Sequence, residues 1–91
     1  MVRLIAQTHA SQGIRANAVS PGILNAGLTR KVAFQRDPAL RQRLQSYILV
    51  KEFGTAEQVA DAFVYLCSPE SNYVTGHILF VDGGCSVRKP T

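Results

Sequence analysis

Hydrophobic residues at the start of this chain recur every three to four positions, which is the spacing of one face of a helix. Val2, Ile5, Ala6 and His9 form this pattern. Gly13 follows, and glycine is the residue type that most often ends a helix in the left-handed conformation. We therefore expect a helix over the first eleven residues.

A short run that can form a strand comes next, from Ile14 to Ser20, with the small and β-branched residues Ala16, Ala18 and Val19. Such residues are typical of a strand packed tightly on both faces, as in a parallel sheet. Pro21 has no N–H to donate, so we expect the chain to leave the sheet there. Gly22 lets the backbone approach a neighbour closely. Because ligands of open α/β sheets bind beyond the carboxyl ends of strands, this pattern predicts a ligand site after Ser20.

Residues 27–53 predict a flap of two helices over the mouth of the sheet. A short helix is expected near residues 28–35. Asp37 and Pro38 then suit the N-cap and the first position of a second helix. That helix carries one apolar stripe, formed by Leu40, Leu44, Tyr47 and Ile48.

The last third of the chain predicts a capped helix and a second strand. Thr55 and Gln58 match a capping box, and the helix they begin extends to Cys67, which falls on its apolar face. Residues 77–82 read as a buried strand, and residues 86–91 as a fraying tail. Two strands separated by so long a connection are expected to be parallel, so the fold class is α/β.

Composition and charge exclude several classes of function. Hydrophobic residues make up 46% of the chain, yet no apolar run is long enough to span a bilayer, and the N-terminus is a poor secretory signal. We therefore expect a cytoplasmic protein with no membrane partner. The net charge is +4, but zinc spacing and interleaved aromatic residues do not accompany the basic residues, so a solvated face is favoured over nucleic-acid binding. The two cysteines and two histidines form no metal-binding pattern.

Two motifs resemble a known family. Residues 13–22 read GIRANAVSPG, and residues 73–84 read YVTGHILFVDGG. Their order and interval resemble the C-terminal third of the short-chain dehydrogenases/reductases. The resemblance implies the C-terminal part of a Rossmann-type doubly wound parallel sheet, in the order helix, strand, flap helices, helix, strand. It also implies that residues 1–91 form part of an NAD(P)-binding domain, that residues 27–53 are its substrate-loop region, and that NAD or NADP is the cofactor.

The resemblance also assigns roles to individual residues. In the family, backbone groups of the second residue after Pro-Gly bind the nicotinamide carboxamide, and that residue here is Leu24. Its neighbours Pro21, Gly22 and Ile23 would shape the cofactor wall. The family usually has threonine two residues after Leu24, where this chain has Ala26. Candidates to line a substrate pocket are Leu28, Val32 and Phe34, although packing in the core explains these three equally well.

The family's catalytic set is not in these 91 residues. Hydride transfer in the family depends on Ser, Tyr and Lys and on a glycine-rich turn, and neither occurs in this sequence. Tyr47 and Lys51 have the Tyr-x-x-x-Lys spacing, but they follow the Pro-Gly motif instead of preceding it. We therefore expect no catalytic residue, and a chain that begins within the helix carrying the catalytic pair.

Two functions remain open. One is the C-terminal fragment of an NAD(P)-dependent oxidoreductase that acts on alcohols or carbonyl compounds and is a homo-oligomer when full length. The other is a non-catalytic remnant that associates with an intact relative.

Overall fold

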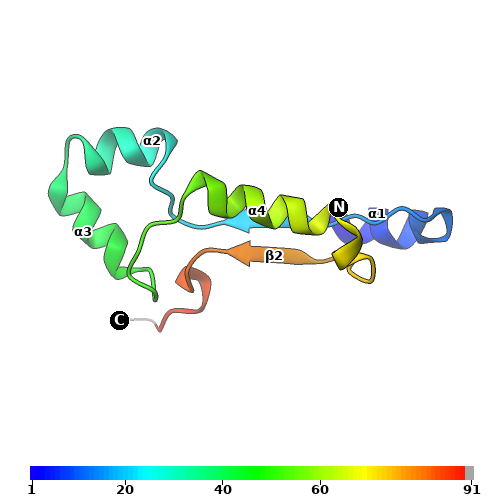
Figure 1. Cartoon of the computed structure of the whole chain (residues 1–91). Helices are drawn as coiled ribbons and strands as arrows, with labels where there is room; N and C mark the ends of the chain where they lie inside the picture. The colour runs from blue at the N-terminus through cyan, green and yellow to red at the C-terminus, as the bar shows by residue number, and fades with distance from the viewer. Residues whose placement is uncertain (90–91) are drawn as a thin grey trace.

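The computed structural model describes residues 1–89, which form a two-stranded parallel sheet with one long helix beside it and a helical flap at one end (Figure 1). The elements in chain order are α1 (Val2–His9), η1 (Ala10–Gln12), β1 (Ala18–Pro21), α2 (Gly27–Thr29), η2 (Arg30–Phe34), α3 (Pro38–Ser46), α4 (Ala56–Leu66), η3 (Pro69–Ser71), β2 (Ile78–Val81) and η4 (Cys85–Val87). Most predicted elements are therefore present, with shifts of a few residues at their ends.

The two strands pair in parallel, as expected, from Ala18 opposite Ile78 to Pro21 opposite Val81. The prediction that the chain leaves the sheet at Pro21 is wrong. The N–H of Ala18 donates to the carbonyl of His77, and the N–H of Gly22 donates to the carbonyl of Val81. Because successive residues of a strand direct their N–H groups to alternate edges, the nitrogen of Pro21 faces the edge away from β2. A proline is tolerated at that position because no ladder hydrogen bond is lost there.

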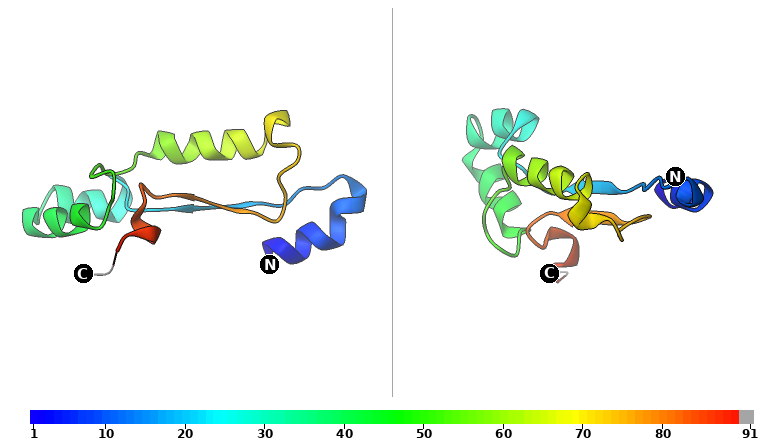
Figure 2. Two further views of the ribbon diagram at one scale, coloured as in Figure 1. Left: turned by 90° about the horizontal axis from the view of Figure 1, so that it is seen from below. Right: turned by 45° about the vertical axis from the view of Figure 1, so that its right-hand side comes forward.

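The prediction that the second strand is buried is also wrong. Helix α4 lies along one side of the sheet, and α1 folds back on the other side near the start of the strands (Figure 2). Ile78 and Phe80 are 42% and 56% exposed, whereas Leu79 and Val81, which point to the opposite face, are half-buried. Residues 1–89 thus cover one face of β2.

The helix ends follow the predicted local chemistry. Gly13 ends the first helical segment with φ of 77°, and Asp37 caps α3 by accepting a hydrogen bond from the N–H of Leu40 at 3.1 Å. Thr55 and Gln58 exchange both hydrogen bonds of the capping box at 3.1 and 3.0 Å. Segment η2 is a π-helical turn, which the apolar spacing did not predict.

Two predictions about side chains near element ends are wrong. Cys67 is exposed at the C-cap of α4, and so is Phe63 one turn before it, because the described residues do not cover that part of the helix. The tail does not fray immediately: residues 85–87 form a 3₁₀ turn, and the guanidinium of Arg88 lies 4.7 Å from the ring centre of Tyr47. Residues 90 and 91, the last of the predicted fraying tail, lie outside the described residues.

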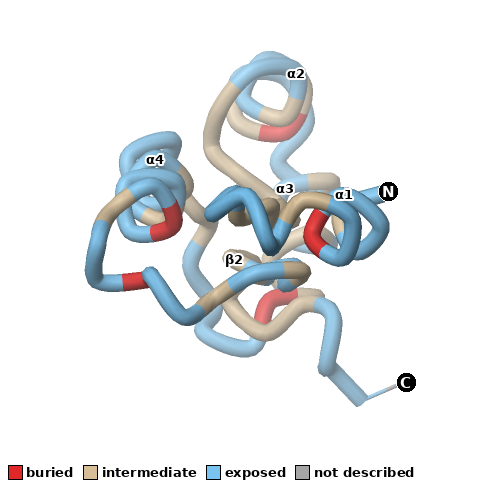
Figure 3. The backbone as a smooth tube through the Cα atoms, turned by 90° about the vertical axis from the view of Figure 1, so that its right-hand side faces the viewer, coloured by how far each residue is buried: buried red, intermediate tan, exposed pale blue. Residues whose placement is uncertain are grey.

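The structure is much more open than a folded chain of this length. Its Cα radius of gyration is 16.1 Å, against about 12 Å expected for a compact domain. Its accessible surface is 6797 Å², against about 5,200 Å² for a folded monomer of equal mass. Within residues 1–89, buried apolar residues occur singly and not as a continuous core (Figure 3): Ala6, Ala33, Ile48 and Leu66. No helix in this range is long and apolar enough to cross a membrane.

Candidate functional site

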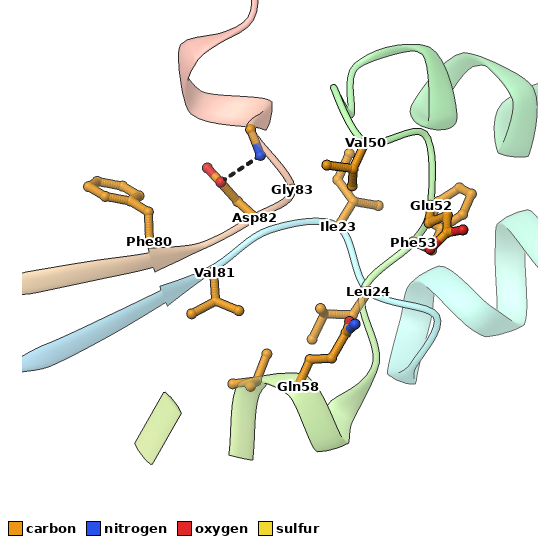
Figure 4. A pocket seen from close by; sticks show the side chains of 13 residues that line it. Ile23, Leu24, Val50, Glu52, Phe53, Gln58, Phe80, Val81, Asp82 and Gly83 are labelled. Carbon is orange, nitrogen blue, oxygen red and sulfur yellow. Dashed lines mark hydrogen bonds between the residues drawn. The ribbon is translucent and has the colours of Figure 1, made fainter. Parts of the chain in front are cut away.

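The carboxyl ends of the two strands meet at a cavity of about 490 Å³ (Figure 4). Its walls come from the turn after β1, the end of the flap, the start of α4 and the turn after β2: Ile23, Leu24, Val50, Glu52, Phe53, Gly54, Gln58, Val59, Phe80, Val81, Asp82, Gly83 and Gly84. The predicted position of a ligand site, beyond the end of the first strand, is thus hollow.

The turn after β2 is held by the carboxylate of Asp82. Its two oxygens accept hydrogen bonds from the N–H groups of Gly84 and Ser86, each at 3.0 Å. Hydrogen bonding from the Ser86 side chain, together with these backbone N–H groups, holds the pKa of Asp82 below its ordinary value. The carboxylate is therefore occupied in shaping the turn.

The end of the flap is fixed to the same turn. The N–H of Val50 donates to the carbonyl of Gly83 at 3.1 Å, and Ile48 is fully buried. Gly83 has φ of 61°, and a Cβ there would lie 2.8 Å from the side chain of Ile48. The apolar stripe predicted for the second flap helix therefore ends in a contact between Ile48 and the glycine turn.

Leu24 lies in a short parallel bridge with Gly54. The N–H of Gly54 donates to the carbonyl of Ile23 at 3.1 Å, and the N–H of Asn25 donates to the carbonyl of Gly54 at 2.9 Å. Successive residues in extended backbone direct their polar groups to opposite edges. The N–H and C=O of Leu24 itself therefore lie on the edge turned away from Gly54, while its side chain is directed into the cavity towards Gln58 (Figure 4).

The candidate substrate residues lie elsewhere. Leu28 is 76% exposed on α2, and the ring of Phe34 packs edge-on against Phe53 with 4.7 Å between ring centres. The guanidinium of Arg41 stacks on the same Phe34 ring at 4.6 Å. Val32 is half-buried in the π-helical turn, and its carbonyl accepts from two N–H groups. These three candidate substrate residues are not in the lining of the strand-end cavity. Of the residues expected to form the cofactor wall, Ile23 and Leu24 line the cavity, and Gly22 packs against Asp82.

Tyr47 and Lys51 do not share a helix. Helix α3 ends at Ser46, and Lys51 has φ of 63° and donates from Nζ to the carbonyl of Ser46. Their Tyr-x-x-x-Lys spacing therefore does not place the two side chains on one face of a helix.

The comparisons with known proteins agree with the motifs. A sequence profile described as "Enoyl-(Acyl carrier protein) reductase" matches residues 1–86. A glucose 1-dehydrogenase from Gluconobacter oxydans is 36% identical over 87 residues, which are 96% of this chain and 32% of that protein. A 3-oxoacyl-acyl-carrier-protein reductase from Buchnera aphidicola is 43% identical over 75 residues, 82% of this chain and 29% of that one. The chain belongs to the short-chain dehydrogenase/reductase family.

Solved structures of the short-chain dehydrogenase/reductase family match the fold as well. A putative 2-deoxy-D-gluconate 3-dehydrogenase from Agrobacterium tumefaciens with bound NADP superposes with a TM-score of 0.86 at 36% identity, over 96% of this chain and 35% of that one. The predicted Rossmann-type α/β architecture is confirmed. This chain spans about a third of the length of the curated relatives it matches.

Sequence reasoning missed how the two family motifs hold each other. Arg15 of the first motif donates to the carbonyls of Ser71 at 2.8 Å and Val74 at 3.0 Å. The amide of Asn17 donates to Val74 at 2.9 Å and accepts from the N–H of His77 at 3.0 Å. These side chains fix β2 beside β1. The sequence signal for this role is that Arg15 and Asn17, a charged and an amide side chain, stand in a short strand-forming run of otherwise small or apolar residues.

Proposed function

We propose that this chain forms the nicotinamide-facing part of an NAD(P)-dependent oxidoreductase that transfers hydride between an alcohol and a carbonyl compound. The observation that carries this proposal is the outward-facing edge at Leu24, created by the pairing of its neighbours with Gly54. Pro21, Gly22 and Ile23 lead into this edge and would form the wall beside it.

The donor set at Leu24 fits a nicotinamide. A carboxamide presents N–H donors and a carbonyl acceptor, and one residue of extended backbone presents an acceptor and a donor on the same edge. Backbone groups on a fixed edge bind this group whatever the side chain. When bound, NAD or NADP would supply the nicotinamide ring that carries the hydride.

These residues hold and orient; they do not move the proton. The Ser-Tyr-Lys set and the glycine-rich turn are not among the 91 residues, and the structure separates Tyr47 from Lys51. We assign the acid–base step and the binding of the cofactor phosphates to residues outside this chain. The strand-end cavity and the flap of residues 27–53 are the substrate side of the proposed site, with Leu28, Val32 and Phe34 as its proposed apolar residues.

A second candidate is a non-catalytic remnant that associates with an intact relative. The accessible surface supports it, because the excess over a compact monomer of this mass is about 1,600 Å², roughly twice the 800 Å² or so that one partner buries in a standard protein interface. Under this alternative, the exposed face of β2 and the surface of α4 would be the contacts. The same two surfaces are our proposal for subunit contacts in a homo-oligomeric full-length enzyme.

A hybrid enzyme tests the proposal. The matching C-terminal third of the Gluconobacter oxydans glucose 1-dehydrogenase is replaced by residues 1–91, and glucose-dependent reduction of NAD and NADP is measured. We expect turnover by the hybrid and none by the isolated chain. Leu24→Pro, which removes the N–H, should lower kcat/KM at least about tenfold, while the matched Leu24→Ala retains activity.

The outcomes separate the two candidates. Equal activity of the Pro and Ala variants, with equal folding by circular dichroism, would contradict the role of Leu24. A folded but inactive hybrid, together with an isolated chain that co-sediments with the intact relative, would favour the remnant.

A further inference from the structure

The net charge of the chain resides entirely in the flap. Residues 27–53 contain six Lys or Arg and two acidic residues, which leaves +4, and the other residues contain four of each. A flap with this net charge attracts molecules of the opposite sign. The two charged residues that line the strand-end cavity itself, Glu52 and Asp82, are acidic, so an anionic group would be held by the flap outside that lining.

The basic side chains of the flap are not neutralised by its own carboxylates. Asp37 is used as the cap of α3. Arg30 donates to the side-chain carbonyl of Asn25, and Lys51 donates to a backbone carbonyl, so both bind uncharged groups. The positive charge therefore remains available to a ligand.

Arg30 is the flap cation tied to the proposed cofactor edge. Its Nε donates to Oδ1 of Asn25 at 3.3 Å, and Asn25 directly follows Leu24. The N–H of Arg30 also bonds the carbonyl of Ala26, which places it one helical turn above the position where this chain lacks the family's threonine. With Nε bound to Asn25, both Nη groups remain as a fork of donors suited to a carboxylate or phosphate.

We propose that Arg30, held by Asn25, binds the oxyanion of an acidic substrate, so that the substrate class is an alcohol or carbonyl compound bearing a carboxylate or phosphate group. This inference rests on the proposed function. The diphosphate of the cofactor offers the same chemistry. The substrate is favoured because the charge is spread over the proposed substrate flap.

The hybrid enzyme separates these sources. KM is measured for glucose, for glucose 6-phosphate as its anionic counterpart with the same reacting carbon, and for NADP, in the parent hybrid, Arg30→Met and Arg43→Met. Arg43 is an exposed flap arginine whose loss changes net charge equally. We expect Arg30→Met to raise KM for glucose 6-phosphate about tenfold or more and to leave KM for glucose and for NADP within twofold. Arg43→Met should change all three KM values less than twofold.

Other results overturn the inference. An active hybrid whose KM for NADP rises instead assigns Arg30 to the cofactor diphosphate, and equal effects of Arg30→Met and Arg43→Met reduce the flap to a general electrostatic surface. DNA binding is measured on the same three proteins. Its loss in both variants, without any change in KM for glucose 6-phosphate, would overturn the inference and indicate a nucleic-acid surface.

A second measurement does not depend on the hybrid turning over. The ¹⁵N-labelled hybrid is titrated with glucose 6-phosphate and with inorganic pyrophosphate, following the side-chain Nε–H signals of Arg30 and Arg43. A saturable shift of the Arg30 signal alone with glucose 6-phosphate supports the proposal. Equal, unsaturable shifts of both arginines overturn it.

Discussion

Gly22 lies so close to Asp82 that a Cβ built on the glycine would be 2.6 Å from the Cα of Asp82. The contact joins the ends of β1 and β2 directly below the turn that leads to Leu24. Because the neighbouring atom is backbone, it cannot rotate away. Glycine is therefore required at this position by space and not by its own backbone angles.

Gly22→Ala should destabilise the assembled hybrid by about 1–3 kcal/mol, because overpacking against fixed backbone forces the strand ends apart. Gly13→Asn is the matched control, since Gly13 has φ of 77° with open space around it and asparagine tolerates that conformation. Thermal unfolding checks both. A Gly22→Ala protein as stable as the control would show that the strand ends can separate freely.

Arg15→Met should be among the most damaging single changes. It removes donors from the carbonyls of Ser71, Val74 and Leu66, which end α4 and the connection to β2. We expect a loss of about 1.5–3 kcal/mol or more in urea unfolding. Arg3→Met, which removes an exposed arginine, should change stability by less than about 0.5 kcal/mol.

Thr55→Ala should cost about 1 kcal/mol, because the first turn of α4 loses its side-chain cap. Thr55→Ser retains the hydroxyl and should be nearly neutral. Amide exchange at Gln58, whose N–H is the capped group, reports the effect locally. Unchanged exchange in the alanine variant would mean that packing alone fixes the helix start.

Asp82 should titrate below its ordinary pKa of 3.8. The folded pKa is the lower one, so the ionised carboxylate stabilises the turn above pH 3.8, and this contribution is lost as the pH falls through the folded value. The amide signals of Gly84 and Ser86 should report the transition by NMR. Asp82→Asn should abolish it, and a midpoint above 3.8 would mean that hydrogen bonding in the turn does not lower the pKa.

The isolated chain should behave as an open, weakly cooperative molecule. Its exposed side chains include Phe63, Val64 and Phe80, and its two-stranded sheet is smaller than an independently stable one. We expect binding of a hydrophobic dye and a broad thermal transition. A sharp transition of a monomer in sedimentation would contradict this expectation.

Local chemistry allowed most elements to be predicted. Asp37, Thr55 and Gly13 act within four residues of themselves, so their roles are readable from neighbours in the chain. The prediction for the end of β1 is wrong because a strand tolerates Pro21 only if the proline nitrogen faces away from the paired strand. Pairing with β2 sets that orientation, and the sequence around Pro21 does not show it.

The candidate site was less predictable, since it depends on contacts between distant segments. Leu24 was selected by family resemblance, but its pairing with Gly54, thirty positions later, has no local signature. The contact of Phe34 with Phe53 is likewise non-local. From the spacing alone, Phe34 could line a substrate pocket or pack in the core, and the structure packs its ring against Phe53. Patterns show which face is apolar, but not what covers it.

The pairing of Leu24 with Gly54 has an entropic consequence. Fixing one residue of a free loop costs on the order of 1–2 kcal/mol, which a ligand would otherwise have to supply on binding. Folding of the flap and α4 has already supplied it, so a molecule that binds at Leu24 meets a preorganised backbone. Its affinity therefore depends on Gly54 even where Gly54 does not touch it.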